Sequence, residues 1–296
     1  MPKNQHDIII LSPHLDDSIA SIGGFMSKKI DEGKMVHSVT YFTEGIDHPQ
    51  LPEKYKKYAI YTKRKEEDKQ ALDFLGATYQ WVDLPERVMR EPWLKNVLEV
   101  FRTPKSITDF QQLKNIQDNI SSLLKQNPNA EFYIPLGIGN HQDHVEVFLA
   151  AFLLMLEKNL FKQFFFYEEL YSLGTRMRRR HFLTKTKMWN KFQAPALSSP
   201  RLGMLLFVMG INNRGSKIED YIQSQLSSIK WKVQIEILEA KHITKKVNAM
   251  FLYPSQTHAF GGKRKRAESI LRKYYDFWKG GVPIWTAEII EKKDNE

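Results

Sequence analysis

The chain has 296 residues, no cysteine and a formal net charge of +10. The lack of cysteine excludes a disulfide framework, a cysteine-based zinc finger, an iron–sulfur site and thiol catalysis, so any metal must be held by His, Asp or Glu. Hydrophobic residues make up 42% and charged residues 26%, a globular mixture that excludes wholesale disorder. The basic excess favours anionic partners such as nucleic acid, anionic lipid surfaces or phosphorylated small molecules.

The N-terminal region enters a short apolar run at once and shows no signal-peptide pattern. The most lipid-like stretch, residues 145–156, is too short to span a bilayer and is followed by Glu157 and Lys158, so it indicates a buried helix. We therefore expect a cytoplasmic protein.

The first half of the chain alternates short apolar runs, typical of buried strands, with amphipathic stretches, typical of helices. Strands are expected at 8–11, 35–42, 79–84, 132–136 and 164–167, and helices at 18–32, in the stretch that ends at Leu75, at 110–124 and at 145–156. This alternation predicts an α/β fold with a doubly wound, mostly parallel, Rossmann-like sheet and helices on both faces. Gly23 and Gly24, inside the first helix, indicate close packing rather than a dinucleotide loop.

The pattern loosens after the fifth expected strand. We expect a single domain over 1–296, with 171–230 as a basic insertion or cap. Residues 176–191 contain seven Lys or Arg and no acid, which fits either a solvated face or a clamp for an anionic group. A strand at 231–238 and helices at 243–253 and 267–278 are expected to follow, the last preceded by a basic knot at 263–266.

Two short polar clusters carry the chemistry. The sequence H-L-D-D at 14–17 follows the first expected strand, and H-Q-D-H at 141–144 follows the strand at 132–136. Chance in a chain of this composition would give about 0.02 and 0.013 such patterns. Asp at these places could be a simple helix N-cap. However, loops that leave the carboxyl ends of strands line the ligand crevice of a doubly wound sheet, so a shared site is expected there.

The residue types in these clusters suit one metal ion. His14 and Asp17 are three residues apart across a tight turn, so both can point into one cavity, and His144 can supply a third ligand. Two imidazoles and a carboxylate, with the fourth position left to water, are typical of catalytic zinc. We expect one Zn²⁺ per chain, although another divalent metal would suit the same ligands.

The remaining members of the clusters suit proton transfer. Asp16 is an adjacent carboxylate that can act as general base. Asp143 lies two residues from His141, so it is expected to raise the imidazole pKa and to keep a cationic donor facing a developing oxyanion. Together these groups indicate hydrolysis of a carbonyl bond.

The sequence resembles the PIG-L/LmbE-like family of zinc-dependent amino-sugar N-deacetylases. The family motif P/A-H-P-D-D-E stands here at 13–18, and H-P-D-H stands at 141–144. Two further family features match Arg64, Glu67, Ala71, Leu75 and Gly76, and then Lys246, Ala249, Ser255 and Gln256. The resemblance covers residues 8–150 well and 231–260 weakly.

The resemblance implies a role for each matched site residue. These roles are metal binding for His14, Asp17 and His144, general base for Asp16, oxyanion stabilisation for His141 with Asp143, and contact with the substrate for Arg64. The chain departs from the family pattern at Leu15 and Gln142, which replace prolines, at Ser18, which replaces Glu, and at Tyr253, which replaces His. These changes bear on loop stiffness and sugar specificity, and they remove no metal ligand.

The resulting prediction is a zinc hydrolase that removes an acetyl group from an N-acetylated amino sugar, in a glycoside, a glycolipid or a related metabolite. Its partner would be a small or lipid-linked N-acetylated sugar, which could be anionic, and no nucleic acid. Contact with a membrane surface through the basic patches is left open, as is the oligomeric state. The alternative is a protein that binds nucleic acid or an anionic surface and carries a vestigial metal site. A metal phosphoesterase would normally use two metals, and the three ligands supply one.

Overall fold

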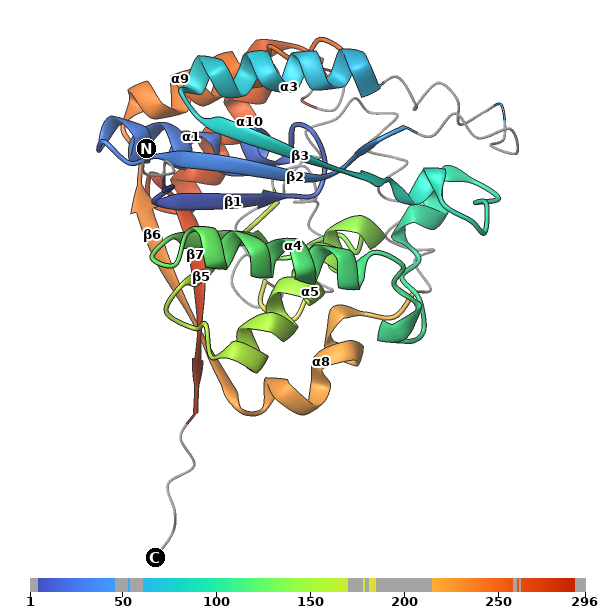
Figure 1. Cartoon of the computed structure of the whole chain (residues 1–296). Coiled ribbons are helices and arrows are strands. Elements are labelled where there is room, and N and C mark those ends of the chain that lie inside the picture. The colour runs from blue at the N-terminus through green and yellow to red at the C-terminus, as the bar shows by residue number, and fades with distance from the viewer. Residues whose placement is uncertain are drawn as a thin grey trace, which may run out of the picture.

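A seven-stranded sheet forms the centre of the fold (Figure 1). The structure is a computed structural model, and it describes residues 5–45, 53, 61–169, 178, 181–184, 215–257, 260 and 262–290. The strand order is β3-β2-β1-β4-β5-β7-β6. The strands are β1 (Ile8–Ser12), β2 (Val36–Glu44), β3 (Thr78–Pro85), β4 (Glu131–Pro135), β5 (Phe164–Tyr167), β6 (Ile229–Ile237) and β7 (Gly281–Ile289).

The direction of the strands confirms the mostly parallel sheet. Strands β1 to β5 pair with one another in parallel, whereas β7 pairs antiparallel with both β5 and β6. All five residues of β1 are buried, because layers of helices cover both faces of the sheet. This double burial explains why the central strands read as continuous apolar runs rather than as alternating ones.

Helices cover both faces of the sheet, as expected (Figure 1). One layer contains α1 (Asp17–Asp31), α3 (Tyr61–Leu75), α9 (Ala240–Met250) and α10 (Arg264–Phe277), and the other contains α4 (Leu113–Gln126) and α5 (Gln142–Lys158). The shorter helices are α8 (Ile218–Leu226), η1 (Arg87–Met89), η2 (Val97–Phe101) and η3 (Ile107–Asp109). Helix α5 is apolar almost all round because it is buried along most of its length.

The C-terminal part of the sheet differs from the sequence expectation. Strand β7 was not expected, since Pro283 disfavours a strand interior. Only Ile284 and Trp285 of β7 pair with β5, so Pro283 lies outside the part of β7 that pairs with this strand. Of the expected insertion at 171–230, residues 215–230 contain α8 and the start of β6, and most of the rest lies outside the described residues. The single-domain division therefore stays a prediction.

Helices α1 and α9 pack closely through Gly23 and Gly24, which confirms the reading of the glycine pair. A Cβ atom at Gly23 would lie 3.3 Å from Lys246 Cγ, and one at Gly24 would lie 2.9 Å from a side-chain atom of Leu238. The buried Lys246 donates hydrogen bonds to the backbone oxygen of Ser21, at 2.9 Å, and to a tyrosine hydroxyl. Ser21 precedes a kink in α1, so this lysine fastens α9 to the helix that carries the first polar cluster.

Lys246 makes stability depend on pH, because burial lowers its pKa to about 7. The unfolded chain keeps a lysine pKa of about 10.4, so between these values the unfolded state binds more protons and the folded state gains roughly 1 kcal/mol per pH unit. We expect the free energy of unfolding of the native protein, measured in urea, to rise relative to that of Lys246→Met from about pH 7 to pH 9. A difference between the two proteins that does not vary with pH would contradict this prediction.

Candidate metal centre

The two polar clusters meet at the carboxyl edge of the sheet. Residues 14–17 lead from β1 into α1, and residues 141–144 lead from β4 into α5. Strands β1 and β4 are neighbours, so their carboxyl ends place the clusters side by side. The sequence expectation of a shared site at this edge is confirmed.

Three donor atoms form a compact triangle in this site. His14 Nδ1, Asp17 Oδ2 and His144 Nε2 lie 3.2 Å from one another along all three sides. A tetrahedral zinc ion with ligands at roughly 2.0–2.2 Å separates its ligand atoms by about 3.3–3.6 Å. All three side chains are buried, and the donor set is therefore chemically and sterically suited to a divalent metal.

A second combination of donors overlaps the first. Ring nitrogens of His14, His141 and His144 all lie within 4.8 Å of one another. The His141 side chain is 14% exposed, whereas that of His144 is fully buried. The shorter separations favour Asp17 over His141 as the third ligand and leave His141 at the wall of the cavity.

Buried carboxylates hold the two ligand imidazoles in orientation. His14 Nε2 donates to Asp143 Oδ2 at 3.0 Å, and His144 Nδ1 donates to Glu169 Oε1 at 3.3 Å. Each ring thus turns its other nitrogen toward the centre of the triangle, an arrangement common around protein-bound metals. The sequence analysis missed Glu169, although its position directly after β5 places it at the same edge of the sheet.

The expected pairing of Asp143 with His141 is wrong. The Asp143 carboxylate comes no closer than 3.9 Å to His141 Nδ1, while the backbone N–H of Asp143 donates to that nitrogen at 3.3 Å. His141 is the N-cap of α5, so its Nδ1 accepts and its proton lies on Nε2. Burial lowers the pKa of His141 well below its usual range despite the nearby carboxylate, so the ring is neutral rather than cationic.

Asp143 is held instead by a loop after β3 that the sequence analysis did not single out. Its carboxylate accepts the backbone N–H of Arg87 at 3.0 Å and forms an ion pair with Arg90. The other end of the Arg90 guanidinium lies 2.9 Å from Glu146 Oε2. These side chains are buried, so Asp143 is fixed by charge on one side and by the ligand His14 on the other.

Asp16 combines unusual backbone geometry with a perturbed carboxyl group. It lies at the start of α1 with φ 104° and ψ −25°, a left-handed conformation that is costly for a non-glycine residue. Its side chain makes no capping hydrogen bond, which argues against a purely structural N-cap. Burial, and then the negative charge of Asp17, raises the pKa of Asp16 well above its usual range.

The backbone of Asp16 is tied to a second buried carboxylate. Asp68 forms a hydrogen bond with this backbone and also accepts Trp81 Nε1–H at 2.9 Å and the hydroxyl of Tyr253 at 2.7 Å. Tyr253 is the residue that replaces histidine in the family pattern. Here it supports the strained turn through Asp68, from the segment that follows α9 in the same helical layer.

Arg64 lies close to the donor triangle. Its Nη1 is 3.8 Å from Glu86 Oε1, and the same oxygen is 3.3 Å from His14 Nε2. Its guanidinium also lies over the ring of Tyr61, at 5.3 Å from the centroid. Within the described ranges, the buried Nε of Arg64 has no hydrogen-bond partner.

The third and fourth family features meet in space. The buried Glu67, one turn from Arg64, accepts hydrogen bonds from the backbone N–H and the hydroxyl of Ser255. These residues therefore join α3 to the segment after α9, and their contact supports the helix that carries Arg64.

The basic segment at 176–191 is only partly described. Arg178 is buried and forms a two-pronged ion pair with Glu168, with distances of 2.8 and 3.0 Å. The same carboxylate accepts hydrogen bonds from Tyr274 and Trp285. Arg178 therefore belongs to the interior and to neither a solvated face nor an exposed clamp, while 179–180 lie outside the described residues.

Across the described ranges, every helix is too short or too polar to cross a lipid bilayer.

Comparison with known proteins identifies the family. Residues 9–155 match the PIG-L family, described as GlcNAc-PI de-N-acetylase. A search of curated proteins gives no match.

Several solved structures share the fold. The zinc-inhibited form of teicoplanin deacetylase Orf2 has a TM-score of 0.67 and 18% identity over 97% of this chain and 99% of its own. Dbv21, the pseudoaglycone deacetylase of the antimicrobial reagent A40926, has a TM-score of 0.65 and 17% identity over 98% of this chain and 100% of its own. N,N'-diacetylchitobiose deacetylase from Pyrococcus horikoshii has a TM-score of 0.50 and 13% identity over 98% and 85%. The solved structures show a shared fold, and the family match over residues 9–155, which includes both polar clusters, shows that the chain belongs to the PIG-L family.

Proposed function

We propose that the protein is a metal-dependent hydrolase that removes an acetyl group from an N-acetylated amino sugar. The observation that carries the proposal is the triangle of His14 Nδ1, Asp17 Oδ2 and His144 Nε2 beside the perturbed carboxyl group of Asp16. The family description and the deacetylases that share the fold support the same reaction class.

In this proposal His14, Asp17 and His144 hold one zinc ion. Such an ion, when bound, polarises a carbonyl oxygen and lowers the pKa of water toward ~7. Three protein ligands would leave a coordination position for water or substrate. Asp143 and Glu169 orient the two imidazoles and contribute further negative charge.

Asp16 is the proposed general base. Its side chain is half-buried and its pKa is raised, so it can accept a proton from the attacking water near neutral pH. The same carboxyl group can then give the proton to the departing amine. With this left-handed backbone the carboxylate makes no capping hydrogen bond, which leaves it free for proton transfer in the proposal.

His141 is the proposed hydrogen-bond donor to the acetyl oxygen. Its Nδ1 is occupied by a backbone N–H, so the neutral ring presents Nε2–H. A donor of this kind stabilises negative charge that develops on the oxygen. Asp143 contributes indirectly, by holding His14, and Arg64 is the proposed contact to the sugar.

Two other function classes fit less well. A phosphoesterase with two metals needs a second set of donors, and in the described part of the chain only one group of potential ligands emerges, around His14 and His144. The intact donor triangle beside oriented carboxylates supports a working metal site over a vestigial one. We further propose a cytoplasmic location, with lipid-linked sugars among the substrates and contact with a membrane surface.

The ligand set can be tested by zinc affinity. We expect Asp17→Ala and His144→Ala to weaken zinc binding by at least about 100-fold, whereas His141→Ala keeps zinc near one per chain. The measurement is elemental analysis together with chelator competition. Loss of zinc in His141→Ala, with retention in Asp17→Ala, would assign the ion to the three histidines.

The general base can be separated from the ligands by substitution. Asp16→Asn keeps the three donors, so it should keep zinc and lose about 10²–10⁴ in kcat for acetate release from an N-acetylglucosamine glycoside. Zinc content and kcat would be measured on the same preparation. A zinc-free Asp16→Asn protein would make Asp16 a ligand.

Arg90 is expected to act on the metal through Asp143. Arg90→Met leaves that buried carboxylate without its ion-pair partner, so zinc affinity of the metal-depleted protein should fall by about 10–100-fold, with partial rescue in Arg90→Lys. Arg102→Met, at an exposed arginine paired with Glu99, is the matched control and should bind zinc like the native protein. Equal zinc affinity in the Arg90 and Arg102 variants would remove Arg90 from the metal centre.

A further inference from the structure

Strand β6 forms an open edge of the sheet. It is the last strand in the order β3-β2-β1-β4-β5-β7-β6, so within the described ranges no strand pairs with its outer side (Figure 1). It pairs with β7 over all nine residues, from Ile229 to Ile237, with an unbroken register, and it contains no proline. An edge strand of this length and regularity is able to accept a further strand.

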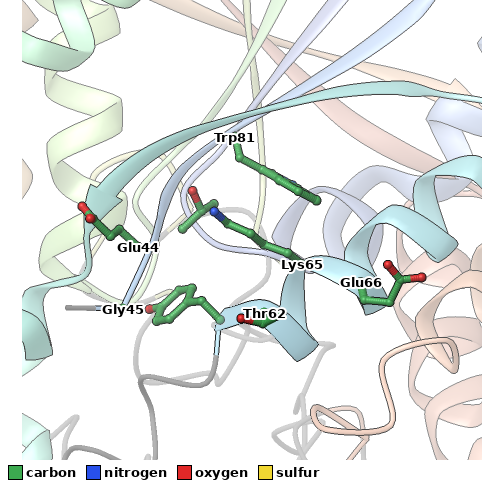
Figure 2. Close-up of a pocket in the computed structure, with 8 residues that line it drawn as sticks. Glu44, Gly45, Thr62, Lys65, Glu66 and Trp81 are labelled. Atoms are coloured by element: carbon green, nitrogen blue, oxygen red, sulfur yellow. The ribbon is translucent and has the colours of Figure 1, made fainter. Parts of the chain in front are cut away.

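The opposite edge, strand β3, is protected against such pairing. Its register with β2 shifts twice, the backbone of Asp83 is left-handed with φ 58°, and the strand ends at Pro85. Lys65 of α3 lies beside Trp81 and forms an ion pair with Asp83, so a charged pair lies at this edge (Figure 2). Irregular backbone, proline and lysine are common devices that stop edge strands from pairing.

The free backbone groups of β6 belong to its apolar residues. Backbone hydrogen bonds join Ser228 to Ile290 and Leu238 to Gly280, directly beyond the two ends of the β6–β7 ladder. Because bonding alternates along an antiparallel pair, the even-numbered residues of β6 bond to β7, and the odd-numbered residues turn their N–H and C=O groups outward. The outward residues are Ile229, Trp231, Val233, Ile235 and Ile237.

We propose that β6 pairs antiparallel with β6 of a second copy of this chain, about a two-fold axis at Val233, so that the two sheets become one. The strand is symmetric about Val233, with four residues on each side. The outward groups of both copies would then form about ten new backbone hydrogen bonds. A two-fold axis uses the same surface on both copies, so the pairing closes as a dimer.

The apolar face of β6 matches itself in this arrangement. Two of the large exposed hydrophobic side chains lie at its ends: Ile237 is 55% exposed, and so is Ile289, which pairs with Ile229. The dimer places Ile237 of each copy beside Ile229 of the other, on the face that also carries Ile289. The facing pairs are Val233 with Val233, Trp231 with Ile235 and Ile229 with Ile237. Each copy therefore covers apolar surface that the other exposes.

The charges on the other face of β6 match as well. Lys230 is exposed and makes no ion pair with a described side chain, and it would lie opposite Glu236 of the second copy. The Oε2 atom of Glu236 contacts two lysines of α1, whereas Oε1 has no ion-pair partner in the described part of the chain. Lys232, which pairs with Glu288 of its own chain at 2.6 Å, would face the uncharged Gln234. Opposite charges facing each other across two strands favour the pairing.

Pairing through β6 leaves both metal centres open. Strand β6 runs parallel to β1, because β7 is antiparallel to both β5 and β6. The two β6 strands of the dimer run in opposite directions, so the carboxyl edges of the two copies lie on opposite sides of the joint sheet. Neither copy covers or completes the metal centre of the other, and the inference is independent of the proposed function.

The first test is sedimentation velocity of the full chain at concentrations from about 1 to 100 µM. We expect the native protein to pass from the mass of one chain to the mass of two as the concentration rises. Val233→Pro removes an outward N–H at the axis from each copy and leaves the bonds to β7 in place, so the dissociation constant should rise at least about tenfold.

A double-mutant cycle tests the facing charges without a change in the backbone. Lys230→Glu places like charges opposite each other in both symmetric contacts, so the dissociation constant should rise about tenfold. In a Glu236→Gln background the same change should raise it by less than about threefold, since the facing charge is gone. Lys125→Glu, the same change at an exposed lysine of α4, is the matched control and should dimerise like the native protein.

Each outcome decides for or against the dimer. A native protein that stays a single chain at every concentration would overturn it, and so would a dimer that neither Val233→Pro nor Lys230→Glu weakens. Equal weakening by Lys230→Glu and Lys125→Glu would also overturn it, by reducing the effect to net charge. If Val233→Pro does not fold, as judged by circular dichroism, the Lys230 cycle decides alone. Zinc content per chain should be the same in all folded variants, because the metal centre lies outside the pairing surface.

Discussion

The buried carboxylate of Asp143 is the contact on which the metal centre depends. It joins three parts of the chain: the loop after β1 through His14, the loop after β3 through Arg87 and Arg90, and the helix α5 on which it lies. Burial alone would raise its pKa, but Arg90 and His14 lower it, so the group stays ionised. An ionised carboxylate in the interior is tolerated only with such partners, and these partners in turn fix the orientation of a metal ligand.

The fold and the position of the site could be predicted because their signals are local. A continuous apolar run such as 8–11 or 164–167 indicates a buried strand, and two polar clusters directly after such runs must meet if the strands are neighbours. The proximity of His14 and Asp17 is likewise a local feature, because the two residues are three apart across one tight turn. Strand β7 escaped prediction since Pro283 contradicts a local rule that the surrounding sheet overrides.

Hydrogen-bond partners could not be predicted, because they depend on the direction in which a side chain points and not only on its position in the sequence. Asp143 is two residues from His141 in sequence, yet on the first turn of α5 its side chain turns toward His14, and only its backbone N–H reaches His141. The buried Glu169 and Arg90 belong to no cluster in the sequence. Glu169 lies two residues after β5, so proximity to a strand end was the available signal for it, whereas Arg90 follows η1 and had no such signal.

Net charge also gave an incomplete guide to the ligand. The chain is basic overall, which favours anionic partners, but the described centre gathers the carboxylates of Asp16, Asp17, Glu86 and Asp143 around two imidazoles. One of the arginines in the most basic segment, Arg178, forms a buried ion pair with Glu168 and so adds no positive charge to the surface. The electrostatic field at a buried site is set by groups within a few ångströms, because more distant surface charges are screened by salt and water. A cluster of buried carboxylates in a basic protein therefore favours a metal cation, whatever the sign of the surface around it.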